Sequence, residues 1–429
     1  MDRRKRILVT TIPAWSERSG ANTFSSLLEG YGANYIANVY TRADLPDSRV
    51  AGRYFQILEW QVVKSVFTLN SHTGKEVKAV EKDTTLNSDT YTKEQQRYRF
   101  FTRNRWYIAL WLRELAWKLG RWKSKELKYF LDSFKPEVVI FSIESYLYYN
   151  RLNRYIVKYC KPHKVIGYLW DDNFTYKQSK HTIFSLFNRF IQRRSVKKTV
   201  EVCNDIISIS KKMKRECDLT FGVNSIVLTK PMRSIHVQSY QYNGSNPIHI
   251  VYTGNLLYGR LNSIKLLIRA ILDINKSDMK FFIDIYTPTV ISQIDFNYIN
   301  NESCRIHGAI PQEEVYIQQQ NADILLFVED INSINNIARL SFSTKITDYL
   351  SCRRCILAIG SIDNSAIEYF KEEDAALTCT CEKDIEITLH KIISNPQMLA
   401  YYAEKAYETS LKNHDKNIIQ NTFFNIINC

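Results

Sequence analysis

The chain has 429 residues, of which 45% are hydrophobic and 24% are charged, a composition that is typical of globular proteins and excludes a disordered one. Because this length exceeds that of one ordinary core, we expect two domains. The net charge of +14 is uneven: residues 1–230 carry 41 Lys and Arg against 22 Asp and Glu (+19), and residues 231–429 carry 17 against 22 (−5). The N-terminal half is therefore expected to meet an anionic partner, either nucleic acid or a lipid surface.

The N-terminus and the cysteines favour a cytoplasmic protein. The opening sequence MDRRKRILVTTIPAW is basic, but its apolar stretch is short and is interrupted by Pro13, which indicates a first strand and not a signal peptide. No apolar run approaches the length of a membrane-spanning helix. The pairs Cys352/Cys355 and Cys379/Cys381 resemble zinc ligands, but they fall in or beside apolar runs. We therefore expect buried, reduced thiols and no metal ion.

Short apolar runs alternate with longer amphipathic stretches through the first half of the chain. Strands are expected at 7–12, 35–41, 137–142, 164–170, 205–210 and 225–229. Between them lie stretches with apolar residues three and four apart, such as 178–200, which predict helices. Residues 68–92 are polar and predict an exposed loop. The alternation of strands and helices indicates a parallel sheet that helices cover on both faces.

The same pattern restarts after a break. Residues 231–247 lack periodicity and end in Asn-Gly-Ser-Asn-Pro, which is typical of a linker. Strands are then expected at 248–254, 281–287, 305–310, 323–328, 355–360 and 375–380, with helices from 382 onward. We predict an α/β protein with two Rossmann-like, doubly wound domains that face a central cleft. They are residues 1–230, the linker 231–247, a second domain at 248–410 and a C-terminal helix at 411–429.

Residues 97–130 are basic and aromatic, with ten Lys or Arg against two Glu. One helical stripe suits packing on the sheet and consists of Ile108, Leu112, Leu115, Leu119 and Trp122. A second stripe interleaves aromatic residues with cations and consists of Trp106, Leu110, Arg113, Trp117 and Arg121. The second stripe suits the headgroup zone of an anionic membrane, although burial of its aromatic residues in the core is the alternative. Nothing matches a known nucleic-acid module, so no nucleic-acid partner is expected.

Candidate ligand-binding residues follow the strands of the second domain, and ligands in such sheets bind at the C-terminal ends of strands. Gly254 ends one strand and allows close approach of the backbone to a ligand. Arg260 and Lys265 lie near the start of the next helix, where two cations can neutralise a diphosphate. The segment HGAIP (307–311), which includes Ile310, is a tight connection whose backbone groups could bind a planar base.

A second candidate lies at the start of a helix in RLSFSTKITDYLSCRRCILAIG (339–360). Ser343, Thr344 and Lys345 offer hydroxyls, free N–H groups and a cation at the helix N-terminus, which favours an anion. Asp348 lies one turn further on the same face, where a carboxylate can accept two hydrogen bonds from vicinal ribose hydroxyls. The alternatives are an ordinary N-cap and solvated charges.

Taken together, these motifs resemble the retaining glycosyltransferases of the GT-B fold, in particular the large family 4. The resemblance extends over nearly the whole chain and is strongest at 204–360. It implies that Arg260 and Lys265 contact the donor diphosphate and that Ser343 and Thr344 form the loop at the distal phosphate. It also implies that Asp348 holds the ribose.

The resemblance further implies that Gly20, in the loop after the first strand, faces the donor. It implies no divalent ion, and Asp171-Asp172 lacks the spaced Asp-x-Asp arrangement of metal-dependent transferases.

Two departures from the family pattern concern the sugar. The first position of an acidic pair is Leu340, so Glu329 or Asp330 would have to hold the sugar hydroxyls. In place of a histidine after an N-domain strand the sequence has YLWDDNF, so Asp171 or Asp172 would stabilise positive charge at the anomeric carbon or orient the acceptor. Glu144 is another strand-end carboxylate expected at the same cleft. Each of these carboxylates could instead be only a helix cap.

The expected function is that of a cytoplasmic enzyme, peripheral on the inner face of the plasma membrane. It would move a sugar from a UDP- or GDP-sugar to a lipid-linked or growing surface glycan, of the capsule, O-antigen or lipopolysaccharide type, with retention at the anomeric carbon. The alternatives are a nucleotide-sugar epimerase of the same fold and a catalytically silent GT-B binding protein.

Overall fold

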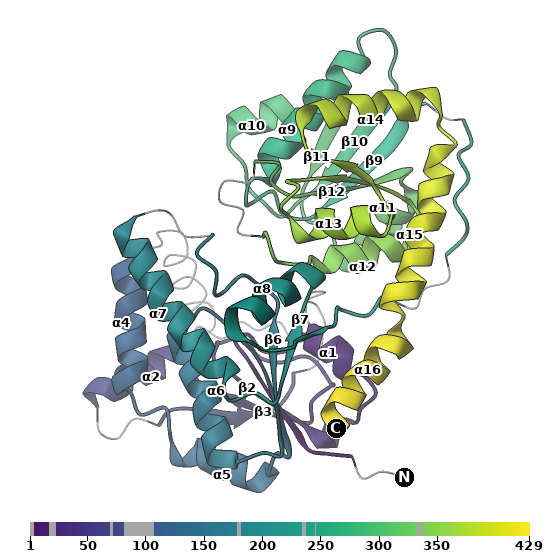
Figure 1. Ribbon diagram of the computed structural model, residues 1–429. Coiled ribbons are helices and arrows are strands. Elements are labelled where there is room, and N and C mark those ends of the chain that lie inside the picture. The colour runs from purple at the N-terminus through teal and green to yellow at the C-terminus, as the bar shows by residue number, and fades with distance from the viewer. Residues whose placement is uncertain are drawn as a thin grey trace.

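The computed structural model describes residues 4–16, 23–68, 72–80, 107–177, 182–233, 237–244, 246–332 and 338–429. These residues form two largely parallel sheets with covering helices (Figure 1), which confirms the predicted α/β class. The first sheet ends before residues 231–247 and the second begins after them.

The first sheet has the strand order β4-β3-β2-β1-β5-β6-β7-β8, and β4 is its antiparallel edge strand. Its strands are β1 (Ile7–Thr11), β2 (Ile36–Tyr40), β3 (Arg53–Gln56), β4 (Lys75–Val77), β5 (Val138–Ser142), β6 (Lys164–Leu169), β7 (Asp205–Ser208) and β8 (Ile226–Val227). All residues of β1, β2 and β5 are buried, as expected for parallel strands covered on both faces.

Each of the six strands expected in the first half is present, but two observed strands were not expected. β3 is a four-residue strand, and β4 lies in 68–92, which the sequence predicts to be a loop. That prediction is wrong for β4 because this strand pairs only with β3 and exposes Lys75 and Glu76, so it carries no apolar pattern.

The helices that connect these strands are α1 (Thr23–Leu28), α2 (Glu59–Phe67), α4 (Tyr107–Leu119), α5 (Lys125–Phe134), α6 (Leu147–Cys160), α7 (Ile183–Val200) and α8 (Lys211–Phe221), with a 3₁₀ turn at Ala33–Tyr35. α6 contacts both α4 and α7, and α2 contacts α4. α4 and α7 therefore flank α6 at the outer edge of this half (Figure 1).

The second sheet is fully parallel, with the order β11-β10-β9-β12-β13-β14. Its strands are β9 (Ile248–Thr253), β10 (Phe281–Tyr286), β11 (Cys304–His307), β12 (Ile324–Val328), β13 (Cys355–Ile359) and β14 (Leu377–Cys379). Its helices are α9 (Arg260–Ile274), α10 (Gln293–Ile299), α11 (Gln312–Asn321), α12 (Thr344–Ser351), α13 (Ser365–Glu372) and α14 (Glu382–Ser394).

The last two helices, α15 (Met398–His414) and α16 (Lys416–Asn428), return the chain to the first sheet. α15 packs on α12 and β13, whereas α16 packs on α1 (Figure 1). The Lys5 ammonium donates to the carbonyls of Ile427 and Asn428 at 3.0 and 2.9 Å, and Phe424 packs against Tyr31. The C-terminal helix therefore covers the N-terminal half.

Strand order reverses between β1 and β5 in the first sheet and between β9 and β12 in the second. Crevices form at the carboxyl ends of strands at such reversals, because the connections leave in opposite directions. The loops after these four strands are therefore where a ligand site is expected.

Candidate functional site

A buried ion pair occupies the strand-order reversal of the second sheet. Arg260 begins α9, and Glu329 directly follows β12. The Arg260 guanidinium donates to both carboxylate oxygens of Glu329, from Nη2 at 2.8 Å and from Nε at 3.2 Å. Arg260 is 8% exposed and Glu329 is 3% exposed. The remaining Nη1 donates to Asn255 Oδ1 at 2.6 Å, so the loop after β9 is tied to the same guanidinium.

Lys345 brings a second cation to this place from the first turn of α12. Its Nζ donates to the Thr253 carbonyl at 3.2 Å and lies 4.6 Å from the centre of the Tyr252 ring. A Cβ at Gly254 would lie 2.5 Å from Nζ, so a larger residue would displace the lysine, and the φ of 145° at Gly254 favours glycine. Burial and the neighbouring Arg260 lower the pKa of Lys345 to about 8, against the opposing effect of Glu329. Two cations, Arg260 and Lys345, therefore lie close together near the end of β9.

Lys265 lies elsewhere. α9 begins at Arg260, so Lys265 is more than one turn further along, and its ammonium pairs with Asp295 of α10. The structure brings Lys345 close to Arg260 and pairs Lys265 with Asp295, and a contact of Lys265 with the donor diphosphate stays a prediction.

The N-terminus of α12 lies beside the end of β9. The Ser343 hydroxyl accepts from the Lys345 N–H at 3.4 Å, and Thr344 is the first helical residue. The Thr253 N–H donates to the Tyr349 hydroxyl at 3.3 Å, which fixes the helix against the strand end. Phosphate binding at Ser343 and Thr344 stays a prediction, and the position of α12 is compatible with it.

Asp348 is already paired. Its Oδ1 lies 3.3 Å from Lys230 Nζ and 3.9 Å from Arg233 Nε, and Lys230 is buried. The expected ribose contact would therefore have to compete with two cations, one at the end of the first half and one in the linker. Ile310 lies partly buried in the loop between β11 and α11, and Gly20 lies outside the described residues.

Leu340, at the first position of the acidic pair, is fully buried. Its side chain belongs to the core, and its carbonyl accepts from the Ser210 hydroxyl at 3.2 Å. Of the two candidate substitutes, Glu329 is engaged by Arg260, and Asp330 Oδ1 accepts from the Asn332 N–H at 3.0 Å.

On the first sheet, Glu144 lies two residues after the end of β5. It is almost fully buried, and Trp170 Nε1 donates to its Oε1 at 2.9 Å. Burial, together with the nearby Asp171 carboxylate, raises the pKa of Glu144 to about 8. Glu144 is therefore mostly protonated at neutral pH and can donate a hydrogen bond.

Asp171 and Asp172 differ in what they contact. Asp171 is exposed and accepts from the Ser341 hydroxyl at 2.6 Å. Asp172 is buried, accepts from the N–H of Thr175 at 2.9 Å and faces Arg339 Nη2 at 3.4 Å. The contacts of Asp172 are therefore those of a capping residue, which was the alternative to a role at the sugar. Asp171 is the carboxylate that is exposed on this loop. Because Ser341 and Arg339 precede α12, the loop after β6 meets the second domain here.

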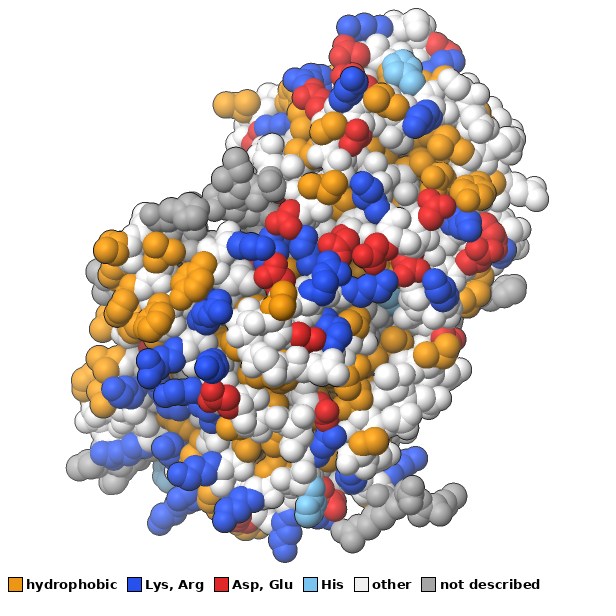
Figure 2. Space-filling view, viewed as in Figure 1, with side chains coloured by type: hydrophobic (Ala, Val, Ile, Leu, Met, Phe, Trp, Pro, Cys, Tyr) orange, Lys and Arg blue, Asp and Glu red, His pale blue; other side chains and the backbone are white. Residues whose placement is uncertain are grey.

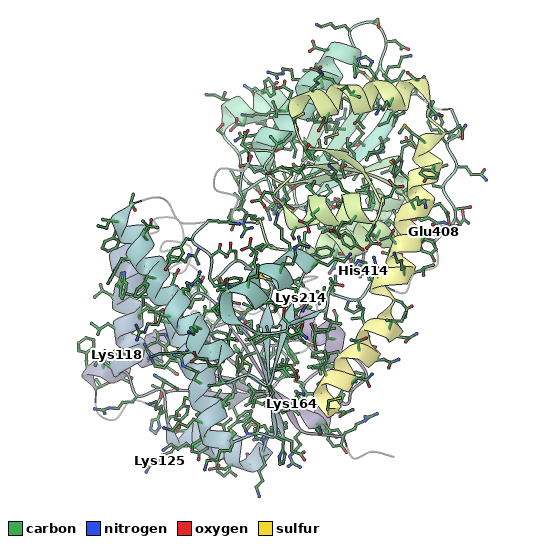
Figure 3. The ribbon with its side chains drawn as sticks, viewed as in Figure 1. Lys118, Lys125, Lys164, Lys214, Glu408 and His414 are labelled. Atoms are coloured by element: carbon green, nitrogen blue, oxygen red, sulfur yellow. The ribbon has the colours of Figure 1, made fainter. Side chains whose placement is uncertain are left out.

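More ion pairs join the two halves beside this point. On α8, Lys212 lies 3.7 Å from Glu368 of α13, and Lys211 lies 3.0 Å from Glu372. Figure 2 shows this belt of mixed red and blue across the middle of the molecule. His414, labelled in Figure 3, is buried where the Thr229 and Tyr369 hydroxyls each lie 2.8 Å from its ring nitrogens.

The basic aromatic helix buries Trp117, which was expected to be exposed, and exposes leucines that were expected to pack on the sheet. Trp117 is 1% exposed and stacks on Tyr148 of α6 with ring centres 4.6 Å apart. Arg113 lies over the same Tyr148 ring at 5.1 Å. These contacts cover the middle of the stripe that was expected to face a membrane, although Leu110 of that stripe is 40% exposed, and Leu112 of the other stripe is 61% exposed. Arg121 is exposed, and Trp106 lies outside the described residues.

Two other expectations concern absent features. Among the described ranges, no three His, Cys, Asp or Glu side chains gather into a group that could hold a metal ion. Over the same ranges, no helix combines the length and the apolar character needed to cross a bilayer. Cys352, Cys355 and Cys379 are buried free thiols, whereas Cys381 is exposed.

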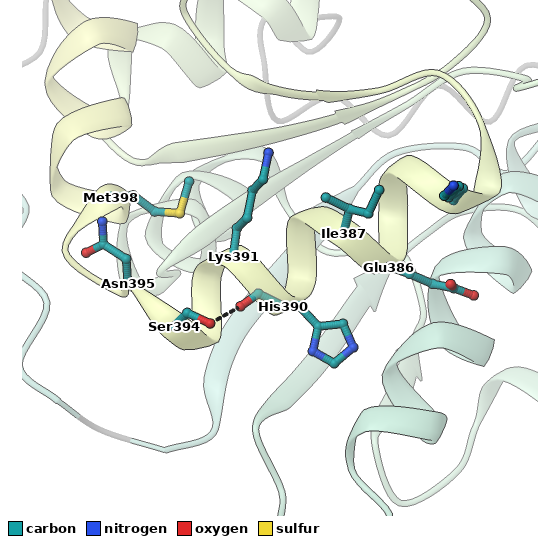
Figure 4. Close-up of a pocket in the computed structure, with 8 residues that line it drawn as sticks. Glu386, Ile387, His390, Lys391, Ser394, Asn395 and Met398 are labelled. Atoms are coloured by element: carbon teal, nitrogen blue, oxygen red, sulfur yellow. Dashed lines mark hydrogen bonds between the residues drawn. The ribbon is translucent and has the colours of Figure 1, made fainter.

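A hollow of about 640 Å³ lies far from the strand ends, on α14 and the turn into α15 (Figure 4). Glu386, His390 and Lys391 line it, and the Ser394 hydroxyl donates to the His390 carbonyl at 2.9 Å. No residue of the strand-end cluster contributes to it.

No protein-family model matches the sequence, and no curated protein matches it. Solved structures match over almost the whole chain. HepE of Anabaena in complex with UDP has a TM-score of 0.61 at 9% identity, with 99% of both chains covered. Sucrose-phosphate synthase of Thermosynechococcus elongatus has a TM-score of 0.62 at 9% identity, covering 99% of this chain and 98% of its own. The lipopolysaccharide outer core galactosyltransferase WaaB has a TM-score of 0.58 at 12% identity, with 98% of both chains covered. The likeness shows that this chain has the GT-B fold.

Proposed function

We propose that the protein is a glycosyltransferase that moves a sugar from a nucleotide sugar to a lipid-linked or growing surface glycan. The observation that carries this proposal is the pair of cations, Arg260 and Lys345, at the strand-order reversal of the second sheet. A UDP-sugar is the favoured donor, because HepE has the same fold and was solved with UDP and with UDP-glucose. GDP remains the second nucleotide to test.

The protein contributes to this reaction mainly by electrostatic stabilisation of the charges that develop. When the bond between the anomeric carbon and the diphosphate oxygen breaks, the leaving group gains negative charge, which Arg260 and Lys345 offset. The acceptor oxygen then bonds to the same face of the sugar, and its proton passes to the departing phosphate oxygen, which gives retention. Asp171 would stabilise positive charge at the anomeric carbon, and the protonated Glu144 would donate a hydrogen bond to a sugar hydroxyl. This scheme needs no metal ion.

A lipid-linked acceptor places the reaction at a membrane surface, and we assign it to the inner face of the plasma membrane. The support is the charge of +19 on residues 1–230, the half that would meet the acceptor.

Incubation with UDP-, GDP- and dTDP-sugars, with and without a lipid-linked saccharide, tests the proposal. Transfer would release a nucleoside diphosphate and enlarge the saccharide, and NMR of the new linkage would establish its anomeric configuration. A changed sugar nucleotide without acceptor would instead identify an epimerase. Binding without any conversion would identify a silent GT-B binding protein.

A further inference from the structure

The outer face of α7 is apolar in its first half. Its exposed apolar residues are Ile183, Phe184, Leu186, Phe187 and Phe190, and Ile183 is 88% exposed. Five such residues within eight positions form an exposed apolar cluster on this helix. Isolated exposed apolar residues are common on soluble proteins, but a cluster on one helix indicates an interaction surface.

α4 adds a second apolar row. Its exposed leucines on one face are Leu112, Leu115 and Leu119. They are exposed because Trp117 and Arg113 on the opposite face pack against α6. α4 and α7 both flank α6, and Figure 2 shows hydrophobic side chains gathered over this edge of the molecule. We call the exposed residues of the two helices, with the basic residues below, the α4–α7 surface.

Basic residues continue the same helices. Residues 183–200 contain five Lys or Arg and no Asp or Glu, and Arg194, Lys197 and Lys198 are exposed. α4 ends near Lys118, and Lys125 follows at the start of α5; both are exposed. Figure 3 labels these two lysines along the outer and lower edge, and Figure 2 shows blue side chains next to the orange cluster.

We propose that the α4–α7 surface binds a bilayer that contains anionic lipids. Exposed apolar side chains next to a row of cations are the combination that inserts into the acyl boundary and attracts anionic headgroups. The inference rests on the proposed function in one respect only: a lipid-linked acceptor would explain why the protein needs to bind a membrane.

Charge favours a bilayer over the other occupants. A second copy of the chain in a two-fold interface would bring the same acid-free basic helix against itself, and like charges across an interface are unfavourable. Nucleic acid would meet the cations and could stack on the phenylalanines, but it would leave the aliphatic Ile183 and the α4 leucines in water, whereas a bilayer buries aliphatic and aromatic side chains alike.

Co-sedimentation of the full chain with vesicles tests the inference without any donor sugar. We expect binding to vesicles of phosphatidylcholine mixed with phosphatidylglycerol, weaker binding at higher salt, and little binding to phosphatidylcholine alone. Replacement of Phe184, Phe187 and Phe190 by Ser should weaken binding at least about tenfold. Replacement of Arg194, Lys197 and Lys198 by Gln should weaken it by about 100-fold.

The matched control is Val290→Ser with Ile294→Ser, which removes two exposed apolar side chains from the second domain and should leave binding unchanged. Thermal melting of each variant checks folding, and the Gln variant decides the question if the Ser variant unfolds. The inference is overturned if the Gln variant sediments like wild type, or if wild type binds both vesicle types equally. It is also overturned if light scattering shows a dimer that the Ser variant converts to monomer. Vesicle binding in a protein that transfers no sugar would refute the proposed function alone.

Discussion

Lys345 and Lys265 offer a direct test of how the donor is held. The structure places Lys345 at the end of β9, 3.2 Å from the Thr253 carbonyl, whereas Lys265 pairs with Asp295. Lys345→Met and Lys265→Met remove the same charge and preserve most of the side-chain volume. A charge-assisted contact is worth about 1.5–3 kcal/mol, and about 1.4 kcal/mol is tenfold in affinity. Lys345→Met should therefore weaken UDP binding by about 10- to 150-fold, and Lys265→Met by less than about twofold.

Titration calorimetry with UDP measures both variants, and its pH dependence adds a second criterion. The pKa of Lys345 is lowered to about 8, so the unliganded protein loses this positive charge as the pH rises through that value. Wild-type affinity should fall between pH 7 and pH 9, by up to about tenfold per pH unit above 8, and the Lys345→Met variant should lack this fall. An equal loss of affinity in the two variants, or a Lys345→Met variant that binds like wild type, would refute the assignment.

Three further predictions concern single residues. Trp117→Ala should lower the free energy of unfolding by about 3–5 kcal/mol in urea titrations, because it leaves a cavity at a buried site. Leu115→Ala, at an exposed position, should lower it much less, and equal effects of the two changes would contradict the burial of Trp117. Glu144 has a pKa raised to about 8, so the folded protein retains a proton that the unfolded chain releases above its ordinary pKa of 4.5. The stability of wild type relative to Glu144→Gln should therefore decrease between pH 4.5 and 8, by at most about 1.4 kcal/mol per pH unit. If the two curves of stability against pH run parallel, Glu144 does not retain a proton in the folded protein. Asp348→Asn should weaken binding of UDP more than binding of inorganic diphosphate, because a ribose contact does not involve the phosphates. If calorimetry shows equal losses of affinity for the two ligands, Asp348 acts only through its pair with Lys230.

The parts of the fold that follow from burial on both faces of a sheet could be predicted from the sequence. β12 is a continuous apolar run and β5 is one apart from its last residue, and the break at 231–247 lies between the two sheets. β4 could not be found, because an edge strand with one partner needs no apolar face.

The candidate site was predicted by strand-end position but not by pairing. Arg260 could be identified because it lies close to the end of β9 in sequence. Lys345 could be proposed only as part of a helix start, since its contact with Thr253 joins segments 92 residues apart. The pairing of Arg260 with Glu329 is equally remote in sequence.

The error on α4 has a specific cause. Periodicity separates the two faces of a helix but does not say which face is covered when both are apolar. Here Tyr148 of α6 packs against both Trp117 and Arg113 and so covers the middle of the stripe that contains cations.

The return of α16 to the first sheet means that the chain passes between the two halves twice, once at 231–247 and once between α15 and α16. Two covalent connections restrict the relative motion of the halves more than one does. They permit rotation about the line that joins them and resist rotation about other axes. Cleavage within 231–247 alone should therefore leave the halves joined through His414 and Asp415. A second domain produced as residues 248–410 would lack α16, and a first half produced as residues 1–230 would leave Tyr31 without Phe424.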